Sequence, residues 1–522
     1  MGMSINLAVP ESHPAGEDQL VETDSSLVPF CLDTFGGRVH VEWDPGGAVT
    51  PLGQLSFFAD FLKTAELFNP WVLDSPLSYA SPNGPKKRDV LGTIFLSVLS
   101  GHKRYSHMSS IRFDGVNPDL LGMSKVVSSD SARRAFTLAD AEAFEAWQVK
   151  HLRQCYEPLL YSPWILDIDS TVKPLYGHQE GAVLGYNPQK PGRPSHVLHT
   201  YFMANTRLVL DVEVGCGNQT AAKYSMPGLW RYLDSLPRAA WPQFLRGDCA
   251  FGNERDMNDA EARGLPYLFK LRQTSGVKRL IKQAFSHEDW KDAGQGWEGV
   301  EESLRLSGWT RQRRVIVLRR RAKDSGALPR NASEKLGEDQ LELTDTALGD
   351  NRLYEYIVLV ASLTDEISAI SQHYRDRGDA ENNFDELKNQ WGWSGYTTKD
   401  MKRCQIMARI IAQVYNWWSL YVGLAIPDRH AEAITSRPLL LHGVAKQTSH
   451  AGQRTITITS PHAEARRIQQ VLSSLSAFLS KIRATARQLT RRERWQWILS
   501  RIFIRFLKDQ DFGKFELLPA PG

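Results

Sequence analysis

The sequence predicts an α/β fold with helical regions at both ends of the chain. Three observations support this class. Apolar runs of strand length, several of them ending in an acidic residue, alternate with helical stretches over residues 161–274 and 361–426. A second group of strand-like runs falls within residues 275–360. Helical periodicity dominates residues 26–160 and 427–522.

The composition is that of a globular protein with several domains. The chain has 522 residues, of which 42% are hydrophobic and 23% charged, which is long enough for roughly two to four domains. Its net charge of +4 permits nucleic-acid binding without arguing for it. The five cysteines form no CxxC pair, so neither a zinc site nor a disulfide framework is predicted. Residues 1–25 are polar and aperiodic, and we expect a disordered tail there.

The N-terminal region, residues 26–160, is predicted to be helical. Helical patterns cover residues 52–68 and 90–101, and Ser128 can cap a further helix that begins soon after it. Several short helices with basic residues between them suit a DNA-binding module of the helix-turn-helix kind. A small helical scaffold packed on the next domain explains the same pattern equally well.

The middle of the chain has the element order of a ribonuclease-H-like core. Three strands, a helix and further strands are predicted, with aspartates at strand ends. They cover residues 163–171, 197–204, 207–214, 220–236, 241–252 and 265–271. Two later helices, over residues 370–391 and 399–425, complete the core. The apolar stretch 407–426 is interrupted by Arg409, Gln413 and Asn416, so we interpret it as a buried helix and not as a membrane span.

Residues 275–360 are predicted to form a β-rich insertion within this core. Strands are expected over residues 300–306, 313–321 and 353–362, with a polar loop at 322–340. Arg319 and its neighbouring arginines could clamp DNA phosphates or protect an exposed strand edge. Trp309 could stack on a flipped base, although a core position is the ordinary role of such a residue, as it is for Trp290 and Trp297.

The predicted C-terminal region, residues 427–522, is helical and basic over 460–508. Its arginines form either a solvated helix face or a surface for DNA or a partner. They are Arg466, Arg467, Arg483, Arg487, Arg491, Arg492 and Arg494.

The most informative segment is the helix predicted over residues 371–391. At 3.6 residues per turn, Tyr374, Arg377, Glu381 and Lys388 fall within about 60° of arc. The apolar residues Ala380, Phe384, Leu387 and Trp391 lie directly beside this stripe, so one side faces a core. A carboxylate flanked by two cations and a phenol is either a helical ion-pair ladder or part of a site that handles phosphate.

The spacing Y-x2-R-x3-E-x6-K of these four residues resembles the Y-R-E-K signature of bacterial cut-and-paste insertion-sequence transposases of the DDE class. Two earlier segments of the sequence resemble one branch of this class, the insertion-sequence Thirteen-Eighty group. They are ILDIDSTVKPLYGHQEGAVLGYNP and FLRGDCAFGN. The match covers roughly residues 160–425.

The resemblance implies a catalytic triad of Asp169, Asp248 and Glu381 that binds two Mg²⁺ ions, for which Mn²⁺ can substitute. Tyr374, Arg377 and Lys388 would contact phosphates near the transposon end. Two residues apart on one strand, Asp167 and Asp169 point to the same face. Asp169 is preferred as the ligand because Ser-Thr follows it, and Asp167 would be a supporting carboxylate.

As the function, the resemblance implies cleavage of transposon ends and their joining to target DNA by two-metal phosphoryl transfer. The partners would be double-stranded DNA, namely terminal inverted repeats and target, and a second copy of the chain in a homodimer. We expect a cytoplasmic, nucleoid-associated bacterial protein with no membrane contact. Two alternatives stay open: a nuclease of the same core without strand transfer, and a DNA-binding regulator without catalysis.

Overall fold

A computed structural model of the chain describes residues 30–504, apart from positions 43, 45, 80, 189, 322–353 and 460–462. The chain divides into two units, Met1–Ala48 and Val49–Gly522. In the first unit, strands β1 (Phe30–Thr34) and β2 (Gly37–Val41) form an antiparallel hairpin. The tail expected over residues 1–25 and the loop expected over 322–340 lie outside the described residues.

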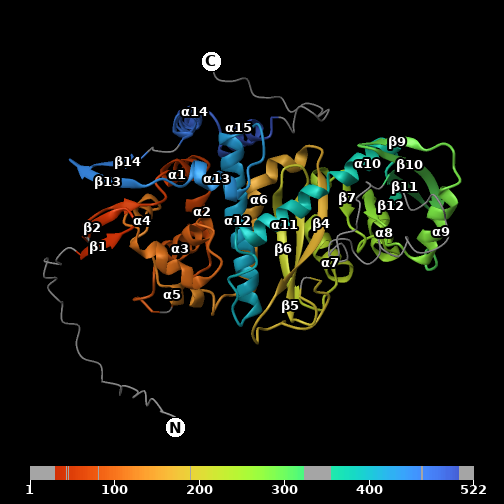
Figure 1. Ribbon diagram of the computed structural model, residues 1–522, viewed down its shortest axis with the longest axis horizontal. Coiled ribbons are helices and arrows are strands. Elements are labelled where there is room, and N and C mark those ends of the chain that lie inside the picture. Colours follow the sequence, from red (N-terminus) through yellow and green to blue (C-terminus); the bar gives the residue numbers. More distant parts are fainter. Residues whose placement is uncertain are drawn as a thin grey trace, which may run out of the picture. The chain divides into compact units, whose positions relative to one another are not determined.

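A nine-stranded sheet organises the described part of the second unit (Figure 1). Its strand order is β6-β5-β4-β7-β8-β12-β11-β10-β9. Strands β4, β7 and β8 run parallel to one another, and all the other neighbouring pairs are antiparallel. The strands are β4 (Ile165–Pro174), β5 (Ser195–Met203), β6 (Leu208–Cys216), β7 (Phe244–Gly247), β8 (Tyr267–Lys270), β9 (Lys291–Gly294), β10 (Trp297–Leu304), β11 (Arg313–Arg321) and β12 (Tyr354–Ala361).

Helices cover this sheet and form the two ends of the unit. The N-terminal ones are α1 (Leu55–Thr64), α2 (Phe68–Asp74), α3 (Lys87–Leu99), α4 (Asn117–Leu120), α5 (Ser129–Arg134) and α6 (Ala141–Tyr156). The later ones are α7 (Ala221–Asp234), α8 (Glu254–Ala262), α9 (Ser275–Ala284), α10 (Ile367–Arg375), α11 (Gly378–Asn389), α12 (Met401–Ala425), α13 (Ala433–Leu440), α14 (Ala465–Ala484) and α15 (Arg491–Ile502). The predicted cap on α5 is present, because the Ser128 side chain accepts a hydrogen bond from the Ser131 amide.

Strand β4 extends three residues past the end that the sequence pattern predicted. The predicted strand ends at residue 171, yet β4 continues to Pro174 because β5 pairs with it from Leu166 to Pro174. Every second residue of a strand points to the same face. The extension therefore adds Lys173 to the row of Asp167, Asp169 and Thr171 on one face of the sheet.

The strands predicted for the insertion extend the same sheet. β12 pairs antiparallel with β8 through Leu359 and Lys270, and β11, β10 and β9 follow in order. Strand β11 has the bounds that the sequence predicted, residues 313–321. Helix α9 and strand β9 were not predicted. Strand β9 is a four-residue polar segment without a pattern, whereas the buried Val277, Leu280, Ile281 and Ala284 of α9 have the spacing of one helix face, so a signal for that helix was available.

The arginines of β11 are neutralised by glutamates on neighbouring elements. Arg314 pairs with Glu301, and Arg319 with Glu298, both at 2.7–2.8 Å across the β10 pairing. Arg313 is buried and pairs with Glu254 and Glu261 of α8. Since β11 lies between β10 and β12, the interpretation of these arginines as protection for a free strand edge is wrong.

Helix α12 lies between the sheet and the N-terminal helices and is buried along most of its length (Figure 1). Its polar residues complete the hydrogen bonds of the outermost strand, β6. Asn416 bonds both the amide and the carbonyl of Val209, at 3.0 and 2.8 Å. Arg409 makes a buried ion pair with Asp211 at 2.8 Å. Among the described residues, no helix is long and apolar enough to cross a membrane.

The two ends of the second unit pack on each other. Strand β3 (Val49–Thr50) pairs with β13 (Ala445–His450), which pairs with β14 (Gln453–Ile458). Arg483 of α14 pairs with Asp60 of α1 at 2.6 Å, and Arg494 of α15 pairs with Glu66 at 2.8 Å. Part of the predicted basic face is therefore used inside the fold.

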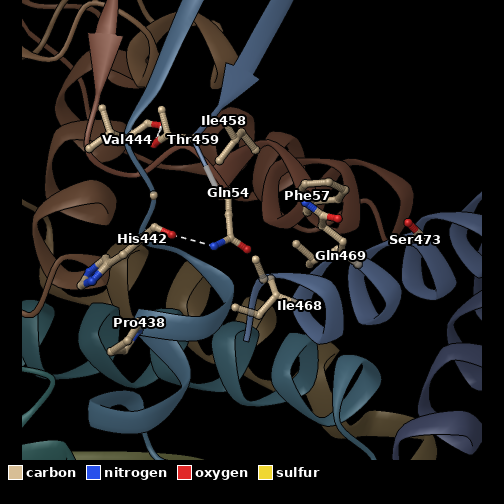
Figure 2. Close-up of a pocket in the computed structure, with 13 residues that line it drawn as sticks. Gln54, Phe57, Pro438, His442, Val444, Ile458, Thr459, Ile468, Gln469 and Ser473 are labelled. Carbon is tan, nitrogen blue, oxygen red and sulfur yellow. Dashed lines mark hydrogen bonds between the residues drawn. The ribbon is translucent and has the colours of Figure 1, made fainter. Parts of the chain in front are cut away.

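A cavity of about 570 Å³ lies between these terminal segments, lined mainly by apolar side chains of α1, α14 and the segments around α13 and β14. Figure 2 shows Gln54 donating a hydrogen bond to the His442 carbonyl oxygen at its centre, at 2.6 Å. The cavity shares no residue with the row of polar residues on β4.

A buried ion pair fixes the contact between the parallel strands β4 and β7. Asp167 and Arg246 face each other in register, and their side chains are only 3% and 1% exposed. Both carboxylate oxygens of Asp167 accept hydrogen bonds from Arg246, at 2.5 and 2.7 Å. Arg246 also donates to the carbonyl oxygen of His373 in α10. One side chain thus ties two strands to a helix that follows them by more than a hundred residues.

Replacing Asp167 by Asn should destabilise the protein strongly, because it leaves the buried Arg246 charge without its counter-charge. The expected loss of unfolding free energy is about 3–5 kcal/mol. Chemical denaturation followed by circular dichroism measures it. The control is Asp130→Asn, which removes an exposed ion pair with Arg133 and should leave the midpoint nearly unchanged. Equal midpoints for the two variants would contradict the anchoring role.

Candidate active site

Two carboxylates meet where the parallel strands β4 and β7 lie side by side. The last paired residues of this contact are Ile168 and Gly247, and each is followed directly by an aspartate, Asp169 or Asp248. Adjacent strands lie about 4.8 Å apart. The parallel register therefore brings the two side chains to neighbouring positions, although 78 residues separate them in the sequence.

The structure separates the environments of Asp167 and Asp169. Both oxygens of Asp167 are engaged by Arg246, deep in the sheet. Asp169 lies one step further along the same face and accepts hydrogen bonds from the Ser170 amide, at 2.7 Å, and from the Arg377 guanidinium. Asp167 is held as a fixed internal anion, while Asp169 stands beside Asp248 and the helical residues.

The helix predicted over residues 370–391 is broken into α10 and α11. Asp376 and Arg377 form a turn between them, with hydrogen bonds from residue i+3 to residue i at Tyr374–Arg377 and Asp376–Asp379. The backbone keeps right-handed helical angles through the turn, so the side chains are displaced only locally. Gly378 lies inside the second of these turns and was the one local signal of the break, but the helical spacing on both sides of it outweighed that signal in the prediction.

Arg377 links the carboxylates of the sheet to those of the helix. It forms an ion pair with Asp169 and another with Glu381 at 3.2 Å. Its own side chain is 8% exposed, whereas that of Glu381 is 70% exposed. Arg377 thus lies between a buried acid and an open one. It was predicted to face DNA, and in this structure its guanidinium faces protein carboxylates.

The electrostatics of the site reflect crowded acids around one guanidinium. Burial raises the pKa of Asp169 to about 7, Arg377 opposes that shift, and the nearby Asp248 and Glu381 add to it. Burial also raises the pKa of the Tyr374 phenol, which lies near Arg377 and Asp248. For Arg377, burial lowers the pKa, but the surrounding acids outweigh it and the net direction is upward. A further cation would relieve the repulsion between these acids.

Lys388 also reaches the sheet. Its Nζ atom donates to Thr171 Oγ1 at 3.1 Å, one step beyond Asp169 in the same row. Burial lowers the pKa of Lys388. Of the four residues of the predicted stripe, Arg377 and Lys388 therefore bond side chains of β4.

The donor set is suited to a hard divalent cation, since it consists of carboxylate oxygens from different elements. Within the described part of the chain, no three His, Cys, Asp or Glu side chains are grouped closely enough to hold a metal ion. The exposed position of Glu381, which contacts Arg377 and not the aspartates, accounts for this. Asp169 and Asp248 are the pair that could hold a cation, with Glu381 as the third donor.

The two site residues predicted in the insertion lie elsewhere. Trp309 is 7% exposed, and the Arg313 guanidinium covers its ring at 5.2 Å. Arg319 stacks on Trp290 at 3.8 Å and pairs with Glu298. Both side chains are engaged inside the insertion, and neither contacts the carboxylates described above.

Three residues near the site were not singled out from the sequence. Arg246 stands two positions before Asp248, so its side chain points to the same face of the sheet, and this spacing was an available signal. Thr171 receives Lys388. Thr200 faces Asp169 in register on β5, and its buried hydroxyl has no partner among the described residues. The pairing of β4 with β5 could not be predicted from local pattern.

Comparison with known proteins gives a family match and similarity to solved structures. Residues 96–479, nearly three quarters of the chain, match the family model described as "Transposase DDE domain group 1". No curated protein matches the sequence. A cryo-EM structure of the piggyBac transposase synaptic complex with hairpin DNA is similar at 12% sequence identity and a TM-score of 0.35, over 91% of this chain and 87% of that chain. Because the family model spans well over half of the sequence, the chain belongs to the DDE-domain transposases.

Proposed function

We propose that this transposase cleaves the ends of its transposon and joins them to target DNA by two-metal phosphoryl transfer at Asp169, Asp248 and Glu381. The observation that carries the proposal is the position of Asp169 and Asp248 at neighbouring sites of two parallel strands. Their crowding with Glu381 around Arg377 adds to it. Family membership supplies the reaction class.

The sheet order supports a ribonuclease-H-like core as the scaffold of this chemistry. Strands β6, β5 and β4 are antiparallel neighbours, and β7 and β8 follow in parallel with a helix before each of them. The sequence pattern predicted these five strands and the helix before β7, but not helix α8 before β8. In this proposal, β9–β12 and α9 form the insertion, and the transposase belongs to the insertion-sequence Thirteen-Eighty group.

Asp169 and Asp248 would hold Mg²⁺ or Mn²⁺ from the sheet, and Glu381 would complete the set from α11. When bound, the two ions activate the attacking oxygen and stabilise the leaving oxygen of an in-line displacement. The chain's own contribution is to fix two half-buried carboxylates and to keep a guanidinium beside them. Arg377 neutralises Asp169 in the resting site, and its charge is placed to stabilise the phosphate undergoing attack.

Lys388 and Tyr374 position the DNA in this proposal. Lys388 stands at Thr171, about 6–7 Å along β4 from Asp169, given a strand rise of about 3.3 Å per residue. That separation suits a contact with a phosphate adjacent to the one being cleaved. Double-stranded DNA is the proposed partner, and a homodimer would pair the two transposon ends. We also propose a bacterial cytoplasmic protein associated with the nucleoid.

Asp169→Asn and Asp248→Asn should each abolish Mg²⁺-dependent cleavage of a duplex carrying the inverted repeats that flank the gene. DNA binding should persist, because neither residue is a cation. Gel assays of cleavage and binding measure both. Asp385→Asn is the matched control: this exposed acid lies one turn after Glu381 on α11 and bonds only Asn389 among the described residues, so cleavage should be retained. Normal cleavage by Asp169→Asn would refute the assignment.

Lys388→Ala should weaken binding of that duplex about tenfold, since a charge-assisted hydrogen bond to phosphate contributes about 1.5–3 kcal/mol. Fluorescence anisotropy at constant salt measures the dissociation constant. Lys399→Ala, which removes an exposed cation outside the row on β4, is the control. Equal losses for both variants would show that only general charge matters.

A nuclease of the same core is the alternative, and it would cut without joining. If the protein is a transposase, cleaved ends with a free 3′-OH should appear covalently joined to a supercoiled target plasmid. Addition of EDTA should stop both cleavage and joining while leaving the DNA bound. Complete cutting with no joined product, under conditions where the ends remain bound, would favour the nuclease.

A further inference from the structure

We propose that a groove beyond the end of β4 holds the sugar-phosphate backbone of the DNA strand that flanks the cleaved phosphate. The groove has a volume of about 400 Å³. Three segments far apart in the sequence form it: residues 103–106, residues 174–179 and residues 394–397. The inference rests on the proposed function, because the groove would bind the same DNA that is cleaved at Asp169 and Asp248.

The groove follows the row of polar side chains on β4, at the end of the strand that carries Lys173. From the interior outward, that row pairs Asp167 with Arg246, Asp169 with Arg377, and Thr171 with Lys388. Lys173 follows, buried, and donates to the Gly395 carbonyl oxygen at 2.5 Å. The next residue, Pro174, and Gly395 itself line the groove. A strand held at Asp169 and Lys388 would therefore reach the groove next.

The charge of the groove suits phosphate. Lys103 and Arg104 line it, and neither side chain has an ion-pair or hydrogen-bond partner in the part of the chain that the structure describes. The arginines of β11 differ in this respect, since four of them are matched by glutamates. Tyr176 also lines the groove, and Arg193, which lies outside the lining, stacks on its exposed ring at 4.5 Å.

The acids that follow the lining segments most closely in the sequence, Glu180 and Asp400, are committed to other contacts. The Glu180 carboxylate accepts a hydrogen bond from the Met401 amide at 3.0 Å. Asp400 caps α12 by accepting from the Arg403 amide, and it also pairs with the Arg403 side chain. Neither acid lines the groove, and its lining contains no carboxylate. The charge left facing the groove is positive.

The floor of the groove is held rigidly, at some conformational cost. Tyr396 has a φ of +48°, a left-handed angle that a residue with a bulky side chain rarely adopts. Its amide donates to the Lys103 carbonyl oxygen at 2.8 Å, and its hydroxyl lies 2.8 Å from Ser97 Oγ. Gly395 lies so close to the Lys103 carbonyl that a Cβ atom there would meet it at 1.8 Å. Strain of this kind is characteristic of positions that a functional surface requires.

The test uses the full-length protein and a short fluorescein-labelled duplex of arbitrary sequence, because contacts to the backbone are independent of sequence. The dissociation constant is measured by anisotropy over a series of KCl concentrations. Each lost phosphate contact lowers the slope of log Kd against log[KCl] by about one. The double variant Lys103→Ala/Arg104→Ala should therefore lose about two from the slope and bind at least about tenfold more weakly at low salt.

Arg112→Ala is the matched control, since Arg112 is exposed on the same short segment but does not line the groove. Its slope should equal that of the parent chain. An unchanged slope for the double variant, or an equal loss for Arg112→Ala, would overturn the proposal. Failure of the proposed function would be a separate result. If the parent chain does not cleave DNA, the proposed catalysis is refuted. A lowered slope in the double variant would still support DNA binding in the groove.

A second measurement locates the bound strand. A photo-crosslinker on Ser106→Cys, in the Asp169→Asn background, should label the strand within about five nucleotides of the cleavage position. This distance follows from five residues of β4 at about 3.3 Å each and about 3.4 Å per nucleotide. The background without Ser106→Cys, treated with the same reagent, gives the reference signal. Labelling that is spread evenly along the duplex, or that is no greater than this reference, would overturn the placement.

Discussion

The parallel contact between β4 and β7 is the constraint on which the rest of the site depends. Asp167 and Arg246 lock its register from inside the sheet, and Arg246 also holds the carbonyl of His373 in α10. A buried ion pair of this kind adds little net stability by itself, but losing one partner is expensive, which makes the register hard to change. With the register fixed, Asp169 and Asp248 have to stand side by side. The tie to α10 places the following turn, with Arg377, against Asp169.

Polar side chains serve different purposes in different parts of this protein. In the insertion, the arginines of β11 are balanced by glutamates, and they hold strands and α8 together. At the edge of the sheet, Asn416 and Arg409 of α12 satisfy the backbone of β6 and Asp211. Along β4, the charged side chains from Asp167 to Lys173 have partners within the fold. Lys103 and Arg104 of the neighbouring groove have none among the described residues, and this difference is the basis for proposing that the groove binds an anionic partner.

The sequence predicted most of the elements, because their apolar periodicity is strong. The strands over residues 313–321 and 353–362 and the helix over 399–425 are observed within two residues. The extension of β4 from residue 171 to Pro174 was missed, since only the pairing of these residues with β5 makes them part of a strand. The break at Asp376–Arg377 was missed as well, because the backbone keeps right-handed helical angles and Gly378 is a weak signal between two helical patterns. The partners of Trp309 and Arg319 could not be predicted, since they come from neighbouring strands and a helix.

The sequence by itself determined the α/β class, most of the strands and helices, and the candidate residues. The elements follow from local periodicity, and the candidate residues follow from the resemblance carried by the spacing of Tyr374, Arg377, Glu381 and Lys388. Only the tertiary structure decided how those residues meet. In the structure, Asp167 pairs with Arg246 and Asp169 lies beside Asp248. The sequence could not distinguish the two aspartates, because they have the same side chain and lie on the same face of one strand. The tertiary structure also turned Arg377 toward a carboxylate, and it joined three distant segments into a groove beyond Lys173. The physical reason is that register and burial are set by contacts between elements far apart in the chain, and no local pattern encodes them.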